Sequence, residues 1–133
     1  MKTDSINQTI QFDAEPKQIY DLIMDAKLHS AFTGSPVVMS DEIKGTFSVF
    51  DGYCTGYNID LVDGEKIVQA WNFKEDGWPE DHYSICTFDL KKTTNGCILY
   101  FNQSDVPEHK IKALSDGWNE YYWEPIKNYL AIK

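Results

Sequence analysis

The sequence predicts an α+β fold in which a curved antiparallel β-sheet wraps around one long C-terminal α-helix, with two short helices after the first strand. Three observations indicate this fold. Apolar and polar residues alternate with period two from residue 37 to residue 104. Residues 108–133 instead carry apolar side chains at helical spacing. A shorter stretch with helical spacing, residues 16–32, separates the first strand from the alternating region.

The first strand is expected in "SINQTIQFDAEP", residues 5–16, where polar and apolar residues alternate. Pro16 suits the first turn of a helix, and Ile19, Leu22 and Ile23 continue it at helical spacing. A second short helix over residues 26–32 ends at "TGSP", which contains a glycine and a proline.

The alternating region predicts an antiparallel meander with one face toward the helix and one more polar face. Asp51-Gly52 and Asp63-Gly64 are strong turn dipeptides, and "TTNG" before Cys97 marks a third turn. In each of three strands, every second side chain then faces the helix. These side chains are Ile67, Gln69, Trp71 and Phe73, then Ser84, Cys86, Phe88 and Leu90, then Cys97, Leu99, Phe101 and Gln103.

The long C-terminal helix has a main apolar stripe that we interpret as its core face, packed on the sheet. The stripe consists of Ile111, Leu114, Trp118, Tyr122, Pro125 and Tyr129. Gly117 costs about 1 kcal/mol within a helix, so we expect a close backbone approach or a break beside it. Pro125 lacks the N–H that would bond the carbonyl of Tyr121, so we expect a bend there.

Trp123 stands apart from this stripe, because it projects about 140° from Trp118 on a regular helix. Two interpretations are open. The bend tucks Trp123 against another element, or Trp123 is a partly exposed aromatic residue that binds a partner. We therefore take Trp123 as the partner-binding candidate.

Composition limits the class of protein. The chain has 133 residues, of which 42% are hydrophobic and 14% aromatic, which favours one folded domain over residues 1–133. Twelve basic and 21 acidic residues give a net charge of −9. Such a surface repels phosphate groups, so we expect neither nucleic acid nor an acidic membrane as partner. No apolar run forms a membrane span or a secretory signal, so a cytoplasmic location is the default prediction.

Catalytic and metal-binding signals are weak. Three widely spaced cysteines without a CxxC pair predict reduced, mostly buried thiols, and the histidines form no ligand pair, so we expect no metal and no cofactor. "GWPEDHY" places His82 beside Glu80 and Asp81, as a general acid or base would need, but we interpret it as a solvated loop before a strand, because adjacent residues in a strand point opposite ways. Gln69 and Gln103 are inward-facing amides that either cap backbone groups or face a cavity.

Several stretches closely resemble the C-terminal domain of the activator of the 90-kDa heat-shock protein ATPase, here the AHSA-type family. They are "GTFSVFDG", "KIVQAWNFKEDGWPEDHYSICTF", "NQSDVP" and "GWNEYYWEPIKNYL", and their order agrees from the first helix to Leu130. The resemblance implies a START-like, birch-pollen-allergen-like helix-grip fold. It also implies a non-catalytic co-chaperone role, with contacts to the ATP-binding domains of a chaperone of this type. The activator's N-terminal chaperone-binding domain is not in this sequence, so we expect weak stimulation by this chain alone.

The superfamily suggests an alternative, which is binding of a small hydrophobic ligand such as a lipid, steroid or polyketide between sheet and helix. The candidate cavity-lining residues are Gln69, Trp71, Cys86, Phe88, Phe101, Gln103, Leu114, Trp118 and Tyr122. An enzyme acting on such a ligand would need a paired acid and base in the cavity, and the sequence identifies no such pair.

Overall fold

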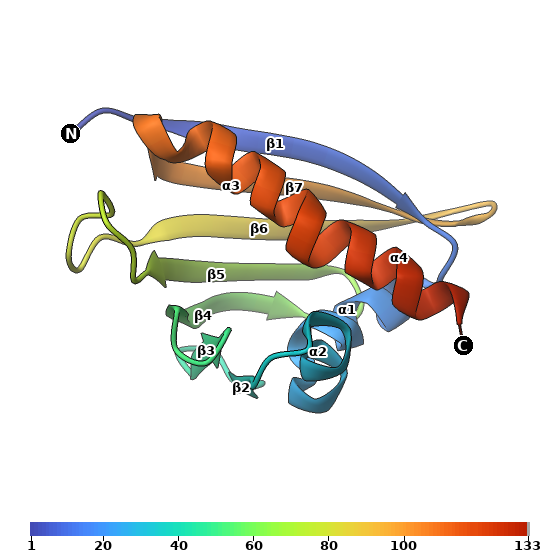
Figure 1. Cartoon of the computed structure of the whole chain (residues 1–133). Coiled ribbons are helices and arrows are strands. Elements are labelled where there is room, and N and C mark those ends of the chain that lie inside the picture. The colour runs from blue at the N-terminus through green and yellow to red at the C-terminus, as the bar shows by residue number, and fades with distance from the viewer. Residues whose placement is uncertain (133) are drawn as a thin grey trace.

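Seven antiparallel strands form one curved sheet in the order β1-β7-β6-β5-β4-β3-β2 (Figure 1). The structure is a computed structural model and describes residues 1–132. Strands β2 to β7 follow one another as a meander, while β1 pairs with β7 at the far edge. The strands are β1 (Thr3–Phe12), β2 (Val38–Met39), β3 (Thr46–Val49), β4 (Cys54–Val62), β5 (Lys66–Phe73), β6 (Ser84–Thr93) and β7 (Gly96–Pro107).

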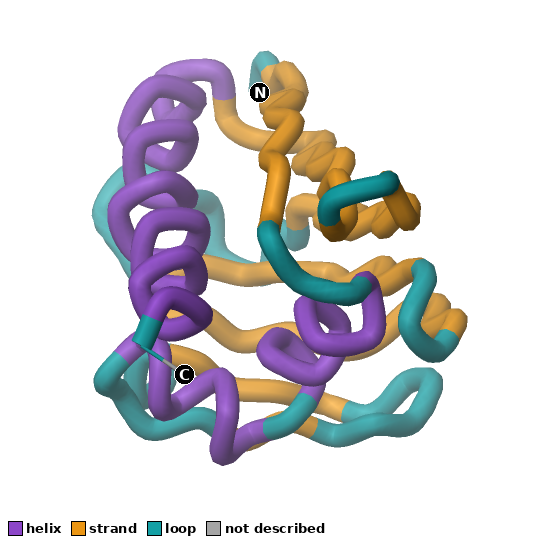
Figure 2. The backbone as a smooth tube through the Cα atoms, turned by 90° about the vertical axis from the view of Figure 1, so that its right-hand side faces the viewer, coloured by secondary structure: helices purple, strands orange, loops and turns teal. Residues whose placement is uncertain are grey.

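One long helical segment crosses a single face of this sheet diagonally (Figure 1). It consists of a 3₁₀ turn (Glu108–Lys110), α3 (Ile111–Trp118), a π-helical turn (Asn119–Trp123) and α4 (Glu124–Ala131). We call this whole segment the C-terminal helix. Figure 2, turned by 90°, shows it running along one side of the strands, with the short helices near its C-terminal end. The α+β fold with a helix laid on a curved antiparallel sheet is thus confirmed.

The two short helices after β1 are α1 (Pro16–Met24) and α2 (Ala26–Thr33). The backbone N–H of Glu15 donates to the side chain of Gln18 at 2.9 Å, which holds the start of α1. Asp25 begins α2 by accepting bonds from the backbone N–H groups of the second and third residues that follow it. The apolar spacing predicted for α1 is confirmed, because Ile19, Leu22 and Ile23 are all buried.

Turn chemistry and alternation set the register of the sheet. The Asp63-Gly64 turn joins β4 to β5, and Gly64 has φ of 73°, a left-handed conformation that glycine adopts without steric cost. Along β5, Ile67, Gln69, Trp71 and Phe73 are buried on the face toward the helix, as predicted. The short edge strand β2 was not predicted, because two residues give no readable period.

Of the two interpretations of Trp123, the first is confirmed and the second, a partly exposed partner-binding residue, is wrong, because its side chain is 0% exposed. The backbone N–H of Glu124 donates to the carbonyl of Asn119, five residues earlier. A π-helical turn of this kind brings residues five apart onto one face of the helix. Trp123 therefore lies on Trp118, with ring centroids 5.6 Å apart and an interplanar angle of 17°.

The irregularity expected at Pro125 takes the form of this π-helical turn. Pro125 has no N–H, so the α-helical bond to the carbonyl of Tyr121 is lost in any case, which lowers the cost of the alternative turn. After this turn, the buried face of the helix is shifted by one residue relative to a regular α-helix. Ile126, at 0% exposure, therefore takes the core position that the predicted stripe assigned to Pro125. The indole N–H of Trp123 donates to Oε1 of Gln8 at 2.7 Å, which fixes the helix to β1.

Candidate functional site

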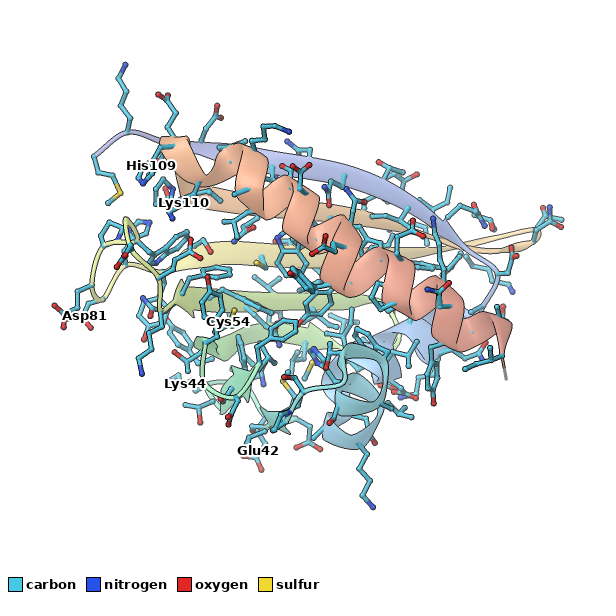
Figure 3. The ribbon with its side chains drawn as sticks, viewed as in Figure 1. Glu42, Lys44, Cys54, Asp81, His109 and Lys110 are labelled. Atoms are coloured by element: carbon cyan, nitrogen blue, oxygen red, sulfur yellow. The ribbon has the colours of Figure 1, made fainter. Side chains whose placement is uncertain are left out.

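A pocket of about 510 Å³ opens between the C-terminal helix and the sheet, where β4 begins and β5 ends. The sheet side contributes Phe50, Tyr53, Cys54, Trp71, Phe73 and Glu75. The helix side contributes Ala113, Leu114, Gly117, Trp118, Tyr121 and Tyr122. Figure 3 labels Cys54 at this end of the sheet and Lys110 at the start of the helix above it. The volume lies within the range of about 300–1,000 Å³ that small-molecule sites occupy.

Seven of these twelve lining residues are aromatic, so the walls consist mainly of ring faces. The two indole N–H groups among them already have partners inside the protein. Trp71 donates to Oε1 of Gln69 at 2.9 Å, and Trp118 donates to Oε1 of Gln103 at 2.8 Å. The pocket therefore has apolar walls and few free hydrogen-bond donors.

Gly117 shapes the helix side of the pocket. The nearest atom to a Cβ built at this position is Cδ2 of Tyr121, at 3.9 Å, which is an ordinary contact. The close backbone approach predicted for Gly117 is therefore wrong, and α3 continues through it without a break. Glycine still costs about 1 kcal/mol relative to alanine here, and the effect of its missing side chain is a wider pocket.

A strained turn shapes the opposite wall. Phe50 and Asp51 have φ of 53° and 55°, and Gly52 follows at 90°. The left-handed conformation costs a non-glycine residue roughly 1–2 kcal/mol. The turn places Phe50 against the helix, with ring centroids 5.9 Å from Tyr121 and 6.1 Å from Tyr122.

The polar groups of the pocket lie at its mouth. The hydroxyl of Tyr53 donates to the carboxylate of Glu75, and Nζ of Lys110 lies 3.1 Å from that carboxylate. Lys110 also donates to the backbone carbonyl of Asp76 at 2.6 Å, which ties the helix start to the loop after β5. Burial, together with the neighbouring Glu75 carboxylate, raises the pKa of Tyr53. The one carboxylate lining the pocket is therefore already paired.

Cys54 is the thiol that lines the pocket. Burial raises its pKa, and the negative charge of Glu75 raises it further, so the thiol stays protonated and is a poor nucleophile. All three cysteines, Cys54, Cys86 and Cys97, are free and buried, which confirms the prediction of reduced, buried thiols.

The two inward amides, Gln69 and Gln103, lie behind the pocket and bond other side chains. Besides accepting from the two tryptophans, Gln69 donates to Oδ1 of Asn58 at 3.0 Å and Gln103 donates to Oγ of Ser84 at 2.9 Å. Both glutamines are 0% exposed. Neither caps a backbone group and neither lines the pocket, so they hold the indole rings in place.

A buried histidine, His29, connects α2 to the pocket wall, and no motif or spacing predicted it. Nδ1 of His29 lies 2.9 Å from the carbonyl of Ile23, so Nδ1 carries the proton and donates. Nε2 is then the acceptor for the hydroxyl of Tyr122, at 2.7 Å. His29 is 0% exposed, and burial lowers its pKa to about 4, although its bond to Ile23 opposes the change.

Of the nine predicted cavity-lining residues, four line the pocket: Trp71, Leu114, Trp118 and Tyr122. Cys86, Phe88 and Phe101 lie deeper, in the closed core, at 0%, 0% and 2% exposure. Phe50, Tyr53, Cys54 and Glu75 were missed because they flank the Asp51-Gly52 turn and the end of β5, where the turn, and not the alternation of a strand, sets the direction of a side chain. Phe73 and Gly117 carried a signal, since Phe73 shares the inward face of β5 and Gly117 is unfavourable in a helix.

The "GWPEDHY" segment is a structured loop between β5 and β6. The indole N–H of Trp78 donates to the carbonyl of His82 at 2.8 Å, and Nε2 of His82 donates to the carbonyl of Asp105 at 2.7 Å. Trp78 is buried, while Asp81 points outward at the far end (Figure 3). His82 therefore stabilises the loop, through its carbonyl to Trp78 and through its ring to Asp105. Across residues 1–132, no cluster of three or more His, Cys, Asp or Glu side chains is arranged to hold a metal ion.

No helix within residues 1–132 is long and apolar enough to cross a membrane.

Comparison with solved structures supports the fold. The crystal structure of an HSP90 activator from Plasmodium falciparum superimposes with a TM-score of 0.87 at 22% identity, and the alignment covers 96% of each chain.

Two curated relatives carry related names. The activator of 90 kDa heat shock protein ATPase homolog 2 of Mus musculus is 28% identical over 98% of this chain. The homolog 1 of Homo sapiens is 30% identical over 87% of it. The chain spans 39% and 34% of the lengths of these relatives. The family model described as Activator of Hsp90 ATPase homolog 1-like protein matches residues 13–131, which is most of the chain. The chain therefore belongs to the AHSA1 family.

Proposed function

We propose that this domain is a non-catalytic, co-chaperone-like module that binds a chaperone of the 90-kDa heat-shock type. The observation that carries the proposal is the family match over residues 13–131, together with relatives named as activators of that chaperone's ATPase. A cytoplasmic location, where such a chaperone would be met, stays a prediction.

The chemistry of the pocket supports a binding role over a catalytic one. The Cys54 thiol is held in its protonated form, and the Glu75 carboxylate is paired with Lys110. Both ring nitrogens of His29 are bonded within the protein. General acid–base catalysis needs a titratable group that faces the substrate with a pKa near the working pH. None of these three groups meets that requirement.

The test is a titration of the purified chain into the purified chaperone by calorimetry, followed by an ATPase assay with a chaperone-specific inhibitor as background control. We expect measurable binding and a weak stimulation of ATP hydrolysis, because the chain spans about a third of each activator it resembles. The absence of both binding and stimulation would contradict the proposal.

A second candidate function is the binding of a small hydrophobic ligand, and the 510 Å³ aromatic pocket favours it. Native mass spectrometry of the freshly purified chain is the direct test. A bound compound that is lost when the pocket is filled by Gly117→Leu would support this candidate. A spectrum of the bare chain, repeated after incubation with extracted cellular lipids, would count against it.

A further inference from the structure

We propose that the pocket receives one large apolar side chain of a protein partner, presented by a segment with basic residues beside it. The inference rests on the proposed protein-binding function and states the chemistry that the partner must bring. It follows from the local costs on both walls of the pocket, from the satisfied hydrogen bonds inside it and from the charges around its rim.

Two unfavourable local features face each other across the pocket. Gly117 weakens the middle of the C-terminal helix, although an alanine would fit there without a clash. Phe50 and Asp51 hold left-handed conformations that non-glycine residues seldom adopt. Gly117 adds nothing to the packing of the fold, whereas the strained turn holds Phe50 against Tyr121 and Tyr122, and both features shape the same opening. Local strain of this kind is typical of binding sites, where an incoming group makes the compensating contacts.

The hydrogen bonding inside the pocket determines what can enter it. The indole N–H groups of Trp71 and Trp118 are already bonded to buried amides, and the hydroxyl of Tyr122 is bonded to His29. A group without donors or acceptors therefore loses nothing on entering, whereas a polar group finds few partners. An aromatic or long aliphatic side chain fits these walls best.

The rim has the character of a protein-binding surface. Tyr121 is 53% exposed and Tyr53 is 42% exposed at the mouth of the pocket. Exposed tyrosines around a deep apolar pocket are typical of the centre of a protein interface, where a partner's anchor residue is buried.

Charge indicates what lies beside the anchor. Asp51 follows Phe50 and Glu120 precedes Tyr121, both acids are exposed, and within residues 1–132 neither forms an ion pair. The nearby cations are mostly engaged, since Lys110 pairs with Glu75 and Lys112 pairs with Asp116. The segments that form the rim are residues 50–54, 71–76 and 110–122. Within them, Lys74 is the one basic side chain without an ion pair. With a chain charge of −9, this rim attracts a basic segment and repels an acidic one.

The first experiment probes the pocket directly with three short peptides: acetyl-Lys-Phe-Lys-amide, acetyl-Glu-Phe-Glu-amide and acetyl-Lys-Ala-Lys-amide. Binding is followed by the NMR signals of the indole N–H groups of Trp71 and Trp118. We expect the first peptide to shift both signals at millimolar concentration, and the other two to bind at least about tenfold more weakly. Equal binding of all three peptides, or shifts that avoid these two tryptophans, would overturn the inference.

A pair of variants then separates the pocket from the rest of the surface. Gly117→Leu fills the pocket with a side chain that suits a helix, and it should abolish the binding of acetyl-Lys-Phe-Lys-amide. Ala131→Leu adds the same side chain to an exposed position at the other end of the helix and should leave binding unchanged. If both variants bind the peptide as the unmodified chain does, the pocket is not the site.

The same two variants, titrated into the chaperone, distinguish the inference from the proposed function. If the unmodified chain binds the chaperone and Gly117→Leu binds it equally well, the inference is overturned and the proposed function stands. If the peptide results are as expected but the chain does not bind the chaperone, the proposed function fails and the pocket serves another basic protein. A small molecule that copurifies in the pocket and resists displacement by the peptide would overturn the inference in favour of a ligand.

Discussion

The two halves of the C-terminal helix contact the same sheet in different ways. In the filled half, Trp118, Tyr122, Trp123 and Ile126 are at most 4% exposed and close the core completely. In the open half, Ile111, Leu114 and Gly117 are half-buried, and the pocket lies beside Leu114 and Gly117 and reaches Trp118 and Tyr122 of the filled half. One helix therefore closes the core at one end and forms the wall of a pocket at the other.

The two halves differ in how their irregular backbone affects the packing. In the filled half, the π-helical turn brings Trp123 inward and gives its N–H a partner on β1. In the open half, the glycine in the helix leaves space without gaining a contact, and the strained turn opposite it holds Phe50 at the edge of that space, against Tyr121 and Tyr122. Irregular backbone thus improves packing where a side chain fills the gap, and leaves a pocket where none does.

The largest expected effect is in the filled half. Trp123→Ala should lower the free energy of unfolding by about 3–5 kcal/mol, because it leaves a cavity beside Trp118 and removes the partner of Gln8. Urea unfolding followed by circular dichroism measures this loss. Tyr121→Ala is the matched control at the mouth of the pocket, where we expect a loss of at most about 1 kcal/mol. Similar losses in the two variants would remove the distinction between the halves.

The stability of the chain should depend on pH through His29, which bonds Tyr122 where the two halves meet. Its pKa is lowered to about 4 in the folded chain, while the unfolded chain has an ordinary histidine pKa of about 6.5. The unfolded state therefore binds more protons between these values, and stability falls as pH is lowered through this window. A difference of this size is worth about 3 kcal/mol at pH 4 relative to pH 7.

Unfolding curves of the unmodified chain and of His29→Gln, measured from pH 7 to pH 4, isolate this contribution. The variant is less stable at pH 7 because it loses the bond to Tyr122, but its stability should depend less on pH in this window. His82→Gln is the control and should keep the pH dependence of the unmodified chain, because it leaves the buried histidine in place. An unchanged pH dependence in His29→Gln would show that His29 does not stay neutral in the folded state.

The smallest expected effect is in the open half. Gly117→Ala should raise the free energy of unfolding by up to about 1 kcal/mol, because alanine suits the helix and its methyl group meets no atom closer than 3.9 Å. Gly56→Ala should be destabilising instead, since its Cβ would lie 1.8 Å from the carbonyl oxygen of Ala70. A destabilised Gly117→Ala chain would mean that this glycine serves the fold and not the pocket.

Much of the fold could be predicted because period and turn chemistry are local. The alternation around Trp71 and Phe101, and the Asp63-Gly64 turn, set the strands, their inward faces and the antiparallel pairing. The helical spacing of Ile19, Leu22 and Ile23 likewise predicted α1 and its buried face. Four of the nine predicted cavity-lining residues line the pocket for the same reason, since an inward position on an element is a property of its sequence.

The layers of the fold, the buried thiols and the acidic surface follow from the sequence, because composition, period and turn residues act over a few neighbours. The tertiary structure alone decided the position of Trp123, the pairing of His29 with Tyr122 and the opening between Phe50 and Gly117. Each of these depends on contacts between elements far apart in the chain, and on a helical turn whose extra residue has no local signature beyond Pro125.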